Sequence, residues 1–217
     1  MTPQDVGPFE GFGVGLADFF DELAEHNERD WFKANKHRYE VEVAAPLRSL
    51  CAALEGEFGS MKIFRPYRDV RFSADKRPIQ EHASAMATSD EGGISYVQVS
   101  GEGLLLAGGF YAPTKSQLAS FRHLLDSEAS AQMVHHELTA LAADGFVLSS
   151  EGRLKSAPRG YSRHHAEIEL LRQTSLAVAR LEPMQAWLST ARCLDEVRAA
   201  WRVVGGWNRW LLAKIDG

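Results

Sequence analysis

Apolar residues recur at helical spacing near the start of the chain. Residues 14–25 carry Leu16, Phe19, Phe20 and Leu23 at intervals of three to four positions. This spacing places the four side chains on one face of a helix and predicts an amphipathic helix there. Before it, the glycine- and proline-rich start of the chain is predicted to be an irregular lead-in.

A second helical pattern follows Asn27 and extends past residue 50. Asn27 is typical of a helix N-cap, and Asp30 stands three residues later, as in a capping box. Pro46 lies inside the pattern and predicts either a kink or the start of a fresh helix, because proline lacks the N–H that a helix interior requires. Gly56 and Gly59 mark the end of this stretch.

In the middle of the chain the spacing of apolar residues changes from the helical interval of three to four positions to the alternation that is typical of β-strands. Residues 62–73 and 94–100 read as strands, and the turn signal 101–103 precedes a third strand at 104–112. The last two strands predict an antiparallel hairpin. Residues 74–92 are polar and are predicted to form a long irregular loop.

Helical patterns return after the hairpin. We expect helices over 114–125, 129–143 and 165–173, a short strand at 146–148, and C-terminal helices beginning at Pro183. Together these elements predict an α+β fold. We expect a single domain over residues 1–217, with residues 1–13 as the irregular lead-in and a central antiparallel sheet covered by N-terminal and C-terminal helices.

The composition fits an ordinary globular chain, with 45% hydrophobic and 24% charged residues. Cys51 and Cys193 lie in apolar surroundings and are predicted to be buried free thiols. The N-terminus lacks the basic and apolar regions of a signal peptide, and no apolar run is long enough to span a bilayer. We therefore expect a cytoplasmic protein without a membrane segment.

Positive charge is concentrated in two short segments. The net charge is −5, yet residues 62–77 and 153–165 carry +4 each, so the rest of the chain carries −13. Duplex nucleic acid requires a broad basic face, which this distribution does not provide. Local positive charge favours a small anion or a phosphorylated partner instead.

The first basic segment has an unusual strand pattern. Its period of two would place one set of residues on a core face: Phe64, Pro66, Arg68, Val70 and Phe72. The alternate set would form the opposite face: Arg65, Tyr67, Asp69, Arg71 and Ser73. The second face would put two guanidinium groups on either side of one carboxylate.

Three interpretations of this segment remain open. In the first, the chain is a binding or accessory domain whose pocket holds a small anionic or phosphorylated ligand. The candidate ligand-binding residues are Arg65, Arg68, Arg71, Lys76, Lys155 and Arg159, of which the last two lie on a Pro-Gly loop that could fold over the strand. In the second interpretation, the arginines and aspartates form a structural ion-pair network.

The third interpretation is an enzyme acting on a phosphate- or carboxylate-bearing substrate. Asp75 or Asp69 would serve as the acid or base, with the arginines stabilising developing charge. Asp75 is the better candidate, because a carboxylate held between cations is a weak base.

No cofactor or metal is predicted. The chain lacks a dinucleotide fingerprint and a phosphate-binding P-loop. The adjacent pairs His135-His136 and His164-His165 point apart on a helix and do not form a ligand set. Gly108-Gly109, within the third predicted strand, indicates a bulge or the close approach of a neighbouring backbone or ligand. The sequence does not indicate the oligomeric state.

Over residues 14–214 the chain resembles a bacterial family of conserved hypothetical proteins, domain of unknown function 2461. Three stretches carry the resemblance: Asn27-Glu28-Arg29-Asp30-Trp31-Phe32 with Asn35 and Tyr39; Phe64-Arg-x-x-Arg-Asp-x-Arg-Phe-Ser-x-Asp-Lys-x-Pro78; and Gly108-Gly109-Phe110-Tyr111 with Leu154-Lys155 and Pro158-Arg159-Gly160-Tyr161. The chain departs from the family pattern at Ile79, where an aromatic is usual, and at His165-Ala166, where the family often has His-Pro. The resemblance implies a compact α+β domain and brings no established activity.

Overall fold

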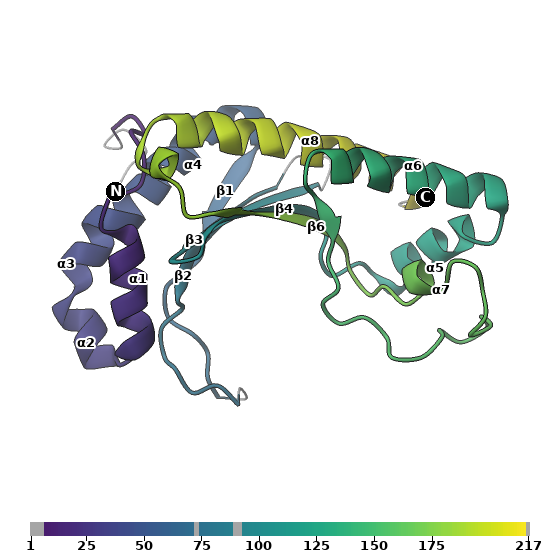
Figure 1. Cartoon of the computed structure of the whole chain (residues 1–217), viewed down its shortest axis with the longest axis horizontal. Coiled ribbons are helices and arrows are strands. Elements are labelled where there is room, and N and C mark those ends of the chain that lie inside the picture. Colours follow the sequence, from purple (N-terminus) through teal and green to yellow (C-terminus); the bar gives the residue numbers. More distant parts are fainter. Residues whose placement is uncertain (1–6, 72–73, 89–92, 216–217) are drawn as a thin grey trace. The chain divides into compact units, whose positions relative to one another are not determined.

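The computed structural model describes residues 7–71, 74–88 and 93–215. It is an α+β structure with a six-stranded antiparallel sheet in the order β1-β2-β3-β4-β6-β5 (Figure 1). The predicted fold class, with helices toward both ends of the chain and an antiparallel sheet, is confirmed.

The chain packs as two compact units, which are described separately. Among the described residues, the first unit comprises 7–88, 96–106 and 181–200, and the second comprises 93–95, 107–180 and 201–215. That residues 1–217 form one domain stays a prediction.

Helices make up the N-terminal part of the first unit. Leu16, Phe19, Phe20 and Leu23 are all buried, as the helical spacing predicted. The successive elements are α1 (Leu16–Glu25), α2 (Arg29–Ala34), α3 (Lys36–Tyr39), a π-helical turn (Glu40–Ala44) and α4 (Ala45–Phe58).

Pro46 lies in the first turn of α4, directly after the π-helical turn, and Ala44 and Ala45 keep helical backbone angles across the junction. The structure therefore shows neither a separate helix start at Pro46 nor a regular α-helix through it, but a change from π- to α-helical turns. The helix ends at Gly59, whose φ of +91° is a left-handed conformation that favours glycine.

Strand β2 (His82–Thr88) corrects the predicted loop over 74–92. It pairs antiparallel with β1 (Ser60–Ile63), and it buries Ala83, Ala85 and Ala87 on one face. Helix α4 packs against both strands. Because alanine has a low β-propensity and a small apolar surface, the alternation of this strand is weak in the sequence.

The predicted hairpin is confirmed as β3 (Ile94–Ser100) and β4 (Gly103–Phe110), which are neighbours in the sheet. Strand β6 (Leu176–Pro183) was not predicted. It pairs antiparallel with the short strand β5 (Val147–Leu148), in register at Val147↔Ala179 and Leu148↔Val178.

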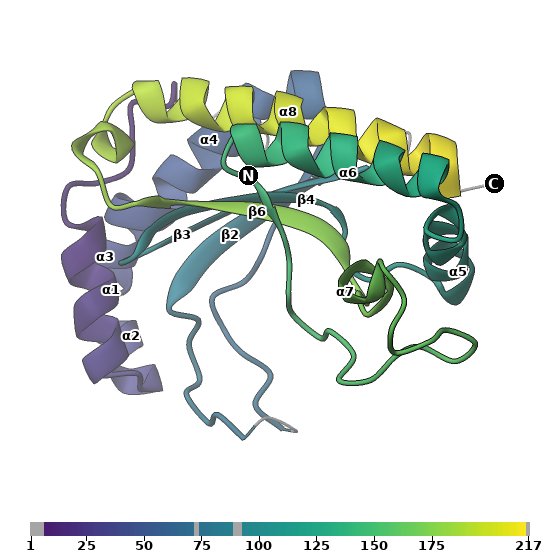
Figure 2. The ribbon, with the colours of Figure 1, turned by 45° about the vertical axis from the view of Figure 1, so that its right-hand side comes forward.

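Helices α5 (Lys115–Leu124), α6 (Glu128–Ala143) and α7 (Ile168–Leu171) belong to the second unit. Thr114 caps α5 through the reciprocal hydrogen bonds of a capping box, which gives the predicted helix start a physical cause. The second half of α8 (Arg192–Ile215) lies alongside α6 (Figure 2).

Both cysteines are buried free thiols, as predicted, and burial raises the pKa of Cys51 and of Cys193 to about 12. Within the described ranges, no helix combines the length and apolar character needed to cross a membrane.

Candidate functional site

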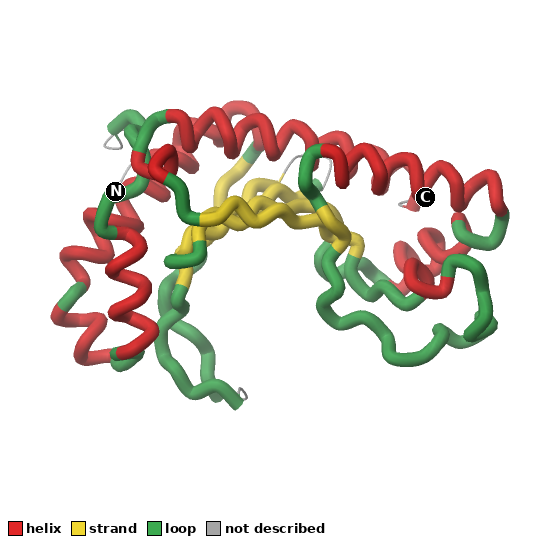
Figure 3. The backbone as a smooth tube through the Cα atoms, viewed as in Figure 1, coloured by secondary structure: helices red, strands yellow, loops and turns green. Residues whose placement is uncertain are grey.

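The segment 64–81, with residues 72–73 outside the described structure, joins β1 to β2 as a long loop (Figure 3). We call it the arginine arm. Two backbone hydrogen bonds hold its two sides together: Arg68 N to Pro78 O at 2.8 Å and Gln80 N to Pro66 O at 2.7 Å. A third, from Phe64 N to Ser84 O at 3.0 Å, ties the start of the arm to β2.

The arginine arm corrects the predicted strand over 62–73, because regular pairing ends at Ile63. Pro66 and Pro78 each accept a hydrogen bond from the other side of the arm, but neither has an N–H to donate in return. A regular ladder of paired hydrogen bonds therefore cannot continue. An isolated bridge at Tyr67↔Ile79 is what remains of it among the described residues.

The predicted core face of this strand is also wrong. None of the described residues from 64 to 71 is buried, and Phe64 and Tyr67 are 37% and 46% exposed. Tyr67 instead packs its ring edge-on against Phe32 at 5.7 Å. Phe72 and Ser73, also assigned to this strand, lie outside the described residues.

Asp75 is bound by two arginines of the arm. Arg77 holds it with its side chain, at 2.7 Å for the closest contact, and with its backbone N–H at 3.0 Å. Arg68 approaches the same carboxylate at 2.6 Å. These contacts, led by the Arg77 side chain, hold the pKa of Asp75 well below its usual range. Arg77 also pairs with Glu81.

Asp69 is bound in a similar way by Arg71. Two guanidinium nitrogens lie 2.7 and 2.9 Å from its oxygens, and the Arg71 N–H adds a bond of 3.2 Å. The Arg71 side chain is the main cause of a lowered pKa at Asp69, and the charge of Arg65 contributes. Lys76 donates to the carbonyl of Val70 at 3.1 Å. Both aspartates are therefore poor proton acceptors at neutral pH.

Asn27 anchors the arm to the helical region. Its amide donates to Ile79 O and its oxygen accepts from Ile79 N, both at 3.0 Å, and it also donates to Glu81 at 3.0 Å. This pairing mimics a neighbouring strand and satisfies the backbone of fully buried Ile79. The predicted N-cap role is wrong: the cap of α2 is Glu28. The Asn27 side chain bonds to the distant backbone of Ile79 and not to the start of the helix.

Replacing Asn27 with alanine is expected to lower the free energy of unfolding by about 1–3 kcal/mol, because two buried backbone groups of Ile79 lose their partner. Urea denaturation measures the loss. Asn27→Asp keeps the acceptor for Ile79 N–H but sets a carboxylate against Ile79 O and Glu81, so it is expected to lose at least as much as alanine. Equal stability of Asn27→Ala and the wild type would contradict this anchoring role.

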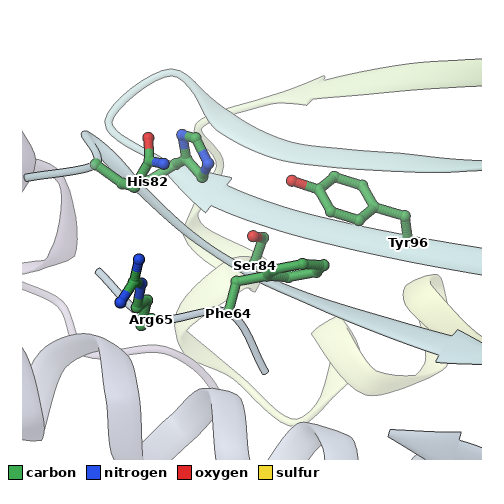
Figure 4. Close-up of a pocket in the computed structure, with 6 residues that line it drawn as sticks. Phe64, Arg65, His82, Ser84 and Tyr96 are labelled. Carbon is green, nitrogen blue, oxygen red and sulfur yellow. The ribbon is translucent and has the colours of Figure 1, made fainter. Parts of the chain in front are cut away.

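A surface pocket of about 160 Å³ lies beside the arm. It combines residues from the arm with residues of β2 and β3, all within the first unit (Figure 4). The lining residues are Phe64, Arg65, Gln80, His82, Ser84 and Tyr96. We call it the Arg65 pocket.

Arg65 differs from the other cations of the arm described above. Within the described part of the chain, its side chain forms no hydrogen bond and no ion pair, although its charge helps to lower the pKa of Asp69. Its guanidinium therefore keeps its donors for water or a ligand.

His82 supplies a neutral imidazole to the pocket. Burial, and secondarily the charge of Arg68, lower the pKa of His82 below its ordinary value, with Glu81 acting in the opposite direction. Sequence reasoning missed His82 and Ser84 as pocket residues. The alternation Gln80-x-His82-x-Ser84 was the signal that could have found them, because it places three polar side chains on one strand face.

The second basic segment belongs to the second unit. Lys155 and Arg159 are exposed there, and Pro158 is buried. Arg172 fixes the local backbone by donating to the carbonyls of Leu154 and Lys155, at 2.5 and 2.8 Å. That Lys155 and Arg159 share one pocket with Arg65 stays a prediction.

One histidine of each adjacent pair has a side-chain partner outside its pair. His135 contacts Glu167 at 2.8 Å, and His164 accepts from Arg163 at 2.9 Å. Across the described ranges, no three His, Cys, Asp or Glu side chains form a group that could hold a metal ion.

Comparison with known proteins identifies the family and adds no activity. Neither the curated proteins nor the solved structures contain a match to this chain. The model of one family, described as "Conserved hypothetical protein (DUF2461)", matches residues 15–210. This match covers the helical region, the arginine arm and the Arg65 pocket, and the chain therefore belongs to the DUF2461 family of conserved hypothetical proteins.

Proposed function

We propose that this chain is a binding module that holds a small anionic ligand, or one phosphorylated group of a partner, in the Arg65 pocket. The observation that carries the proposal is the position of Arg65. It lines a pocket without an ion-pair partner among the described residues, while neighbouring arginines of the arm are bound to aspartates.

The bound arginines support the pocket in a different way. Arg68 and Arg77 share Asp75, and Arg71 grips Asp69, so these cations stabilise the shape of the arm. These ion pairs support a structural role for Arg68, Arg71 and Arg77, and the proposal assigns ligand binding to Arg65. A ligand reaching Arg68 or Arg71 would have to compete with a carboxylate that is already in place.

The remaining polar lining suits an anion. Ser84 and Gln80 carry hydrogen-bond donors, and His82 is neutral near pH 7, so none of these three adds negative charge. A guanidinium can hold a carboxylate or phosphate through two parallel hydrogen bonds. These groups together offer one fixed cation and several neutral donors to a compact anionic group.

An enzyme acting on a phosphate- or carboxylate-bearing substrate is the second candidate. The specific observation in its favour is His82, an uncharged imidazole in the same pocket as Arg65. His82 is a better proton acceptor at neutral pH than Asp75 or Asp69, whose pKa values are lowered by their arginines. In this function His82 would be the base and Arg65 would stabilise developing charge.

Arg65→Gln is expected to weaken the binding of inorganic phosphate by roughly tenfold to a hundredfold, because charge-assisted hydrogen bonds contribute about 1.5–3 kcal/mol. Isothermal titration calorimetry on the full chain measures the dissociation constant. Arg29→Gln is the matched control: it removes an exposed arginine of the same unit that does not line the pocket.

Equal affinity in Arg65→Gln and the wild type would contradict the proposal, as would a wild type that binds neither a phosphate nor a carboxylate. Arg159→Gln tests the second basic segment: a loss as large as that of Arg65→Gln would place it at the same ligand. Turnover of a bound phosphate ester that disappears in His82→Gln would make the site catalytic.

A further inference from the structure

We infer that the ligand of the Arg65 pocket carries a planar ring next to its anionic group, as in an aryl phosphate or an aromatic carboxylate. This inference rests on the proposed function, since it names the class of anion that the pocket accepts. It is carried by two aromatic side chains that line the pocket together with Arg65.

The pocket has a charged end and an aromatic end. Figure 4 shows Arg65 and His82 on one side of Ser84, with the rings of Phe64 and Tyr96 on the other. A ligand that spans the pocket would therefore place its anionic group at Arg65 and an apolar, flat group near the two rings. A bare phosphate or acetate would use the charged end alone.

The two rings are held in place and remain accessible. Their centroids are 6.4 Å apart in an edge-to-face arrangement, with an interplanar angle of 61°. The Phe64 N–H bonds to Ser84 O at 3.0 Å, and the Tyr96 hydroxyl donates to Gln98 at 2.9 Å. Phe64 nevertheless leaves 37% of its surface exposed. Aromatic rings pair favourably with a further ring in edge-to-face or offset geometry.

Charge near the rings favours an anionic aromatic over a neutral one. The ammonium of Lys62 lies 5.0 Å from the centroid of the Phe64 ring, so the aromatic end is also flanked by a cation. A cationic aromatic ligand would be repelled by both Lys62 and Arg65.

The pocket has room for a single ring. An apolar protein cavity of about 150 Å³ is large enough to bind benzene. The Arg65 pocket measures about 160 Å³, so one six-membered ring fills most of it. The anionic group would then lie at the Arg65 end of the pocket.

The experiment compares four probes on the full chain by isothermal titration calorimetry: phenyl phosphate, inorganic phosphate, benzoate and acetate. Phenyl phosphate is expected to bind about tenfold more tightly than inorganic phosphate, and benzoate about tenfold more tightly than acetate. If only one pair shows measurable binding, that pair identifies the anionic group. Equal affinity within each pair would overturn the aromatic inference while leaving anion binding intact, and absence of binding by all four would overturn the proposed function as well.

Two variants and one spectroscopic measurement locate the effect. Phe64→Leu is expected to lower the ratio of phenyl phosphate to phosphate affinity about tenfold, to a value close to one. Tyr67→Leu is the control, because Tyr67 is an exposed aromatic of the same arm that does not line the pocket. Intermolecular NOEs from phenyl phosphate to the Phe64 and Tyr96 rings are expected in the wild type. Their absence, or an equal loss of selectivity in Tyr67→Leu, would overturn the inference.

Discussion

Replacing Gly109 with alanine is expected to lower the free energy of unfolding by roughly 3–5 kcal/mol, through backbone strain combined with overpacking. Gly109 has a φ of +105°, a conformation that L-residues rarely adopt. A Cβ placed there would lie 2.4 Å from Leu176 O and 2.9 Å from the indole nitrogen of Trp207. The first is a backbone atom of the neighbouring strand β6, which cannot move without breaking the sheet.

Urea denaturation of the full chain measures this loss, with Gly206→Ala as the matched control. Gly206 lies within α8 and has nothing within 4 Å of an added Cβ. Alanine there is expected to raise stability by about 0.5–1 kcal/mol, because it restricts the unfolded chain and favours the helix. Unchanged stability of Gly109→Ala would show that β4 adjusts its backbone at this point.

Trp207→Ala is expected to cost about 3–5 kcal/mol, the range for removing a large aromatic side chain from a core. Trp207 is 2% exposed and stacks on Trp210 with ring centroids 5.2 Å apart. Its indole N–H donates to Leu176 O at 2.9 Å, beside Gly109. The substitution therefore removes packing volume and a buried hydrogen bond together.

Guanidinium denaturation separates these two contributions when Trp207→Phe is measured in parallel. Phenylalanine keeps an aromatic ring in the core and deletes the donor to Leu176 O, so an intermediate loss of about 1–3 kcal/mol is expected. A loss in Trp207→Phe as large as that in Trp207→Ala would assign the effect to the hydrogen bond alone. No loss in either variant would contradict the packing of Trp207 in the core.

Elements with strong local signals were predicted well from the sequence. The buried stripe Leu16, Phe19, Phe20 and Leu23 of α1 follows from helical spacing, and Thr114 starts α5 through a capping box. The β3–β4 hairpin follows from alternation around a glycine turn. In each case the physical cause acts between residues a few positions apart, so it is visible in the sequence.

Elements that depend on distant partners were missed or misplaced. Strand β2 buries alanines under α4, and their small side chains carry little periodic signal. Asn27 looks like a helix cap, yet its side chain serves the backbone of Ile79, 52 positions away. A helix N-cap contributes about 1 kcal/mol to stability. Leaving a buried backbone N–H or C=O without a hydrogen bond can cost more than that, about 1–3 kcal/mol per group.

The candidate site divides in the same way. The cluster of arginines and aspartates is plain in the sequence, and Arg65 was among the residues expected to bind an anion. The sequence could not show which arginines form ion pairs with aspartates. That depends on how the arm folds back after its two prolines end the regular strand pairing. His82, Ser84 and Tyr96 joined the site through pairing of β2 and β3 in the sheet.

Sequence periodicity alone thus established the α+β class, the first helix, the hairpin and the concentration of positive charge in the arm. Tertiary folding assigned the individual roles: it bound Arg68, Arg71 and Arg77 to aspartates and left Arg65 at a pocket with two aromatic rings. The physical reason is range. Periodicity and capping act over one or two turns of chain, whereas the occupancy of a charged group depends on partners that only the folded chain brings within hydrogen-bonding distance.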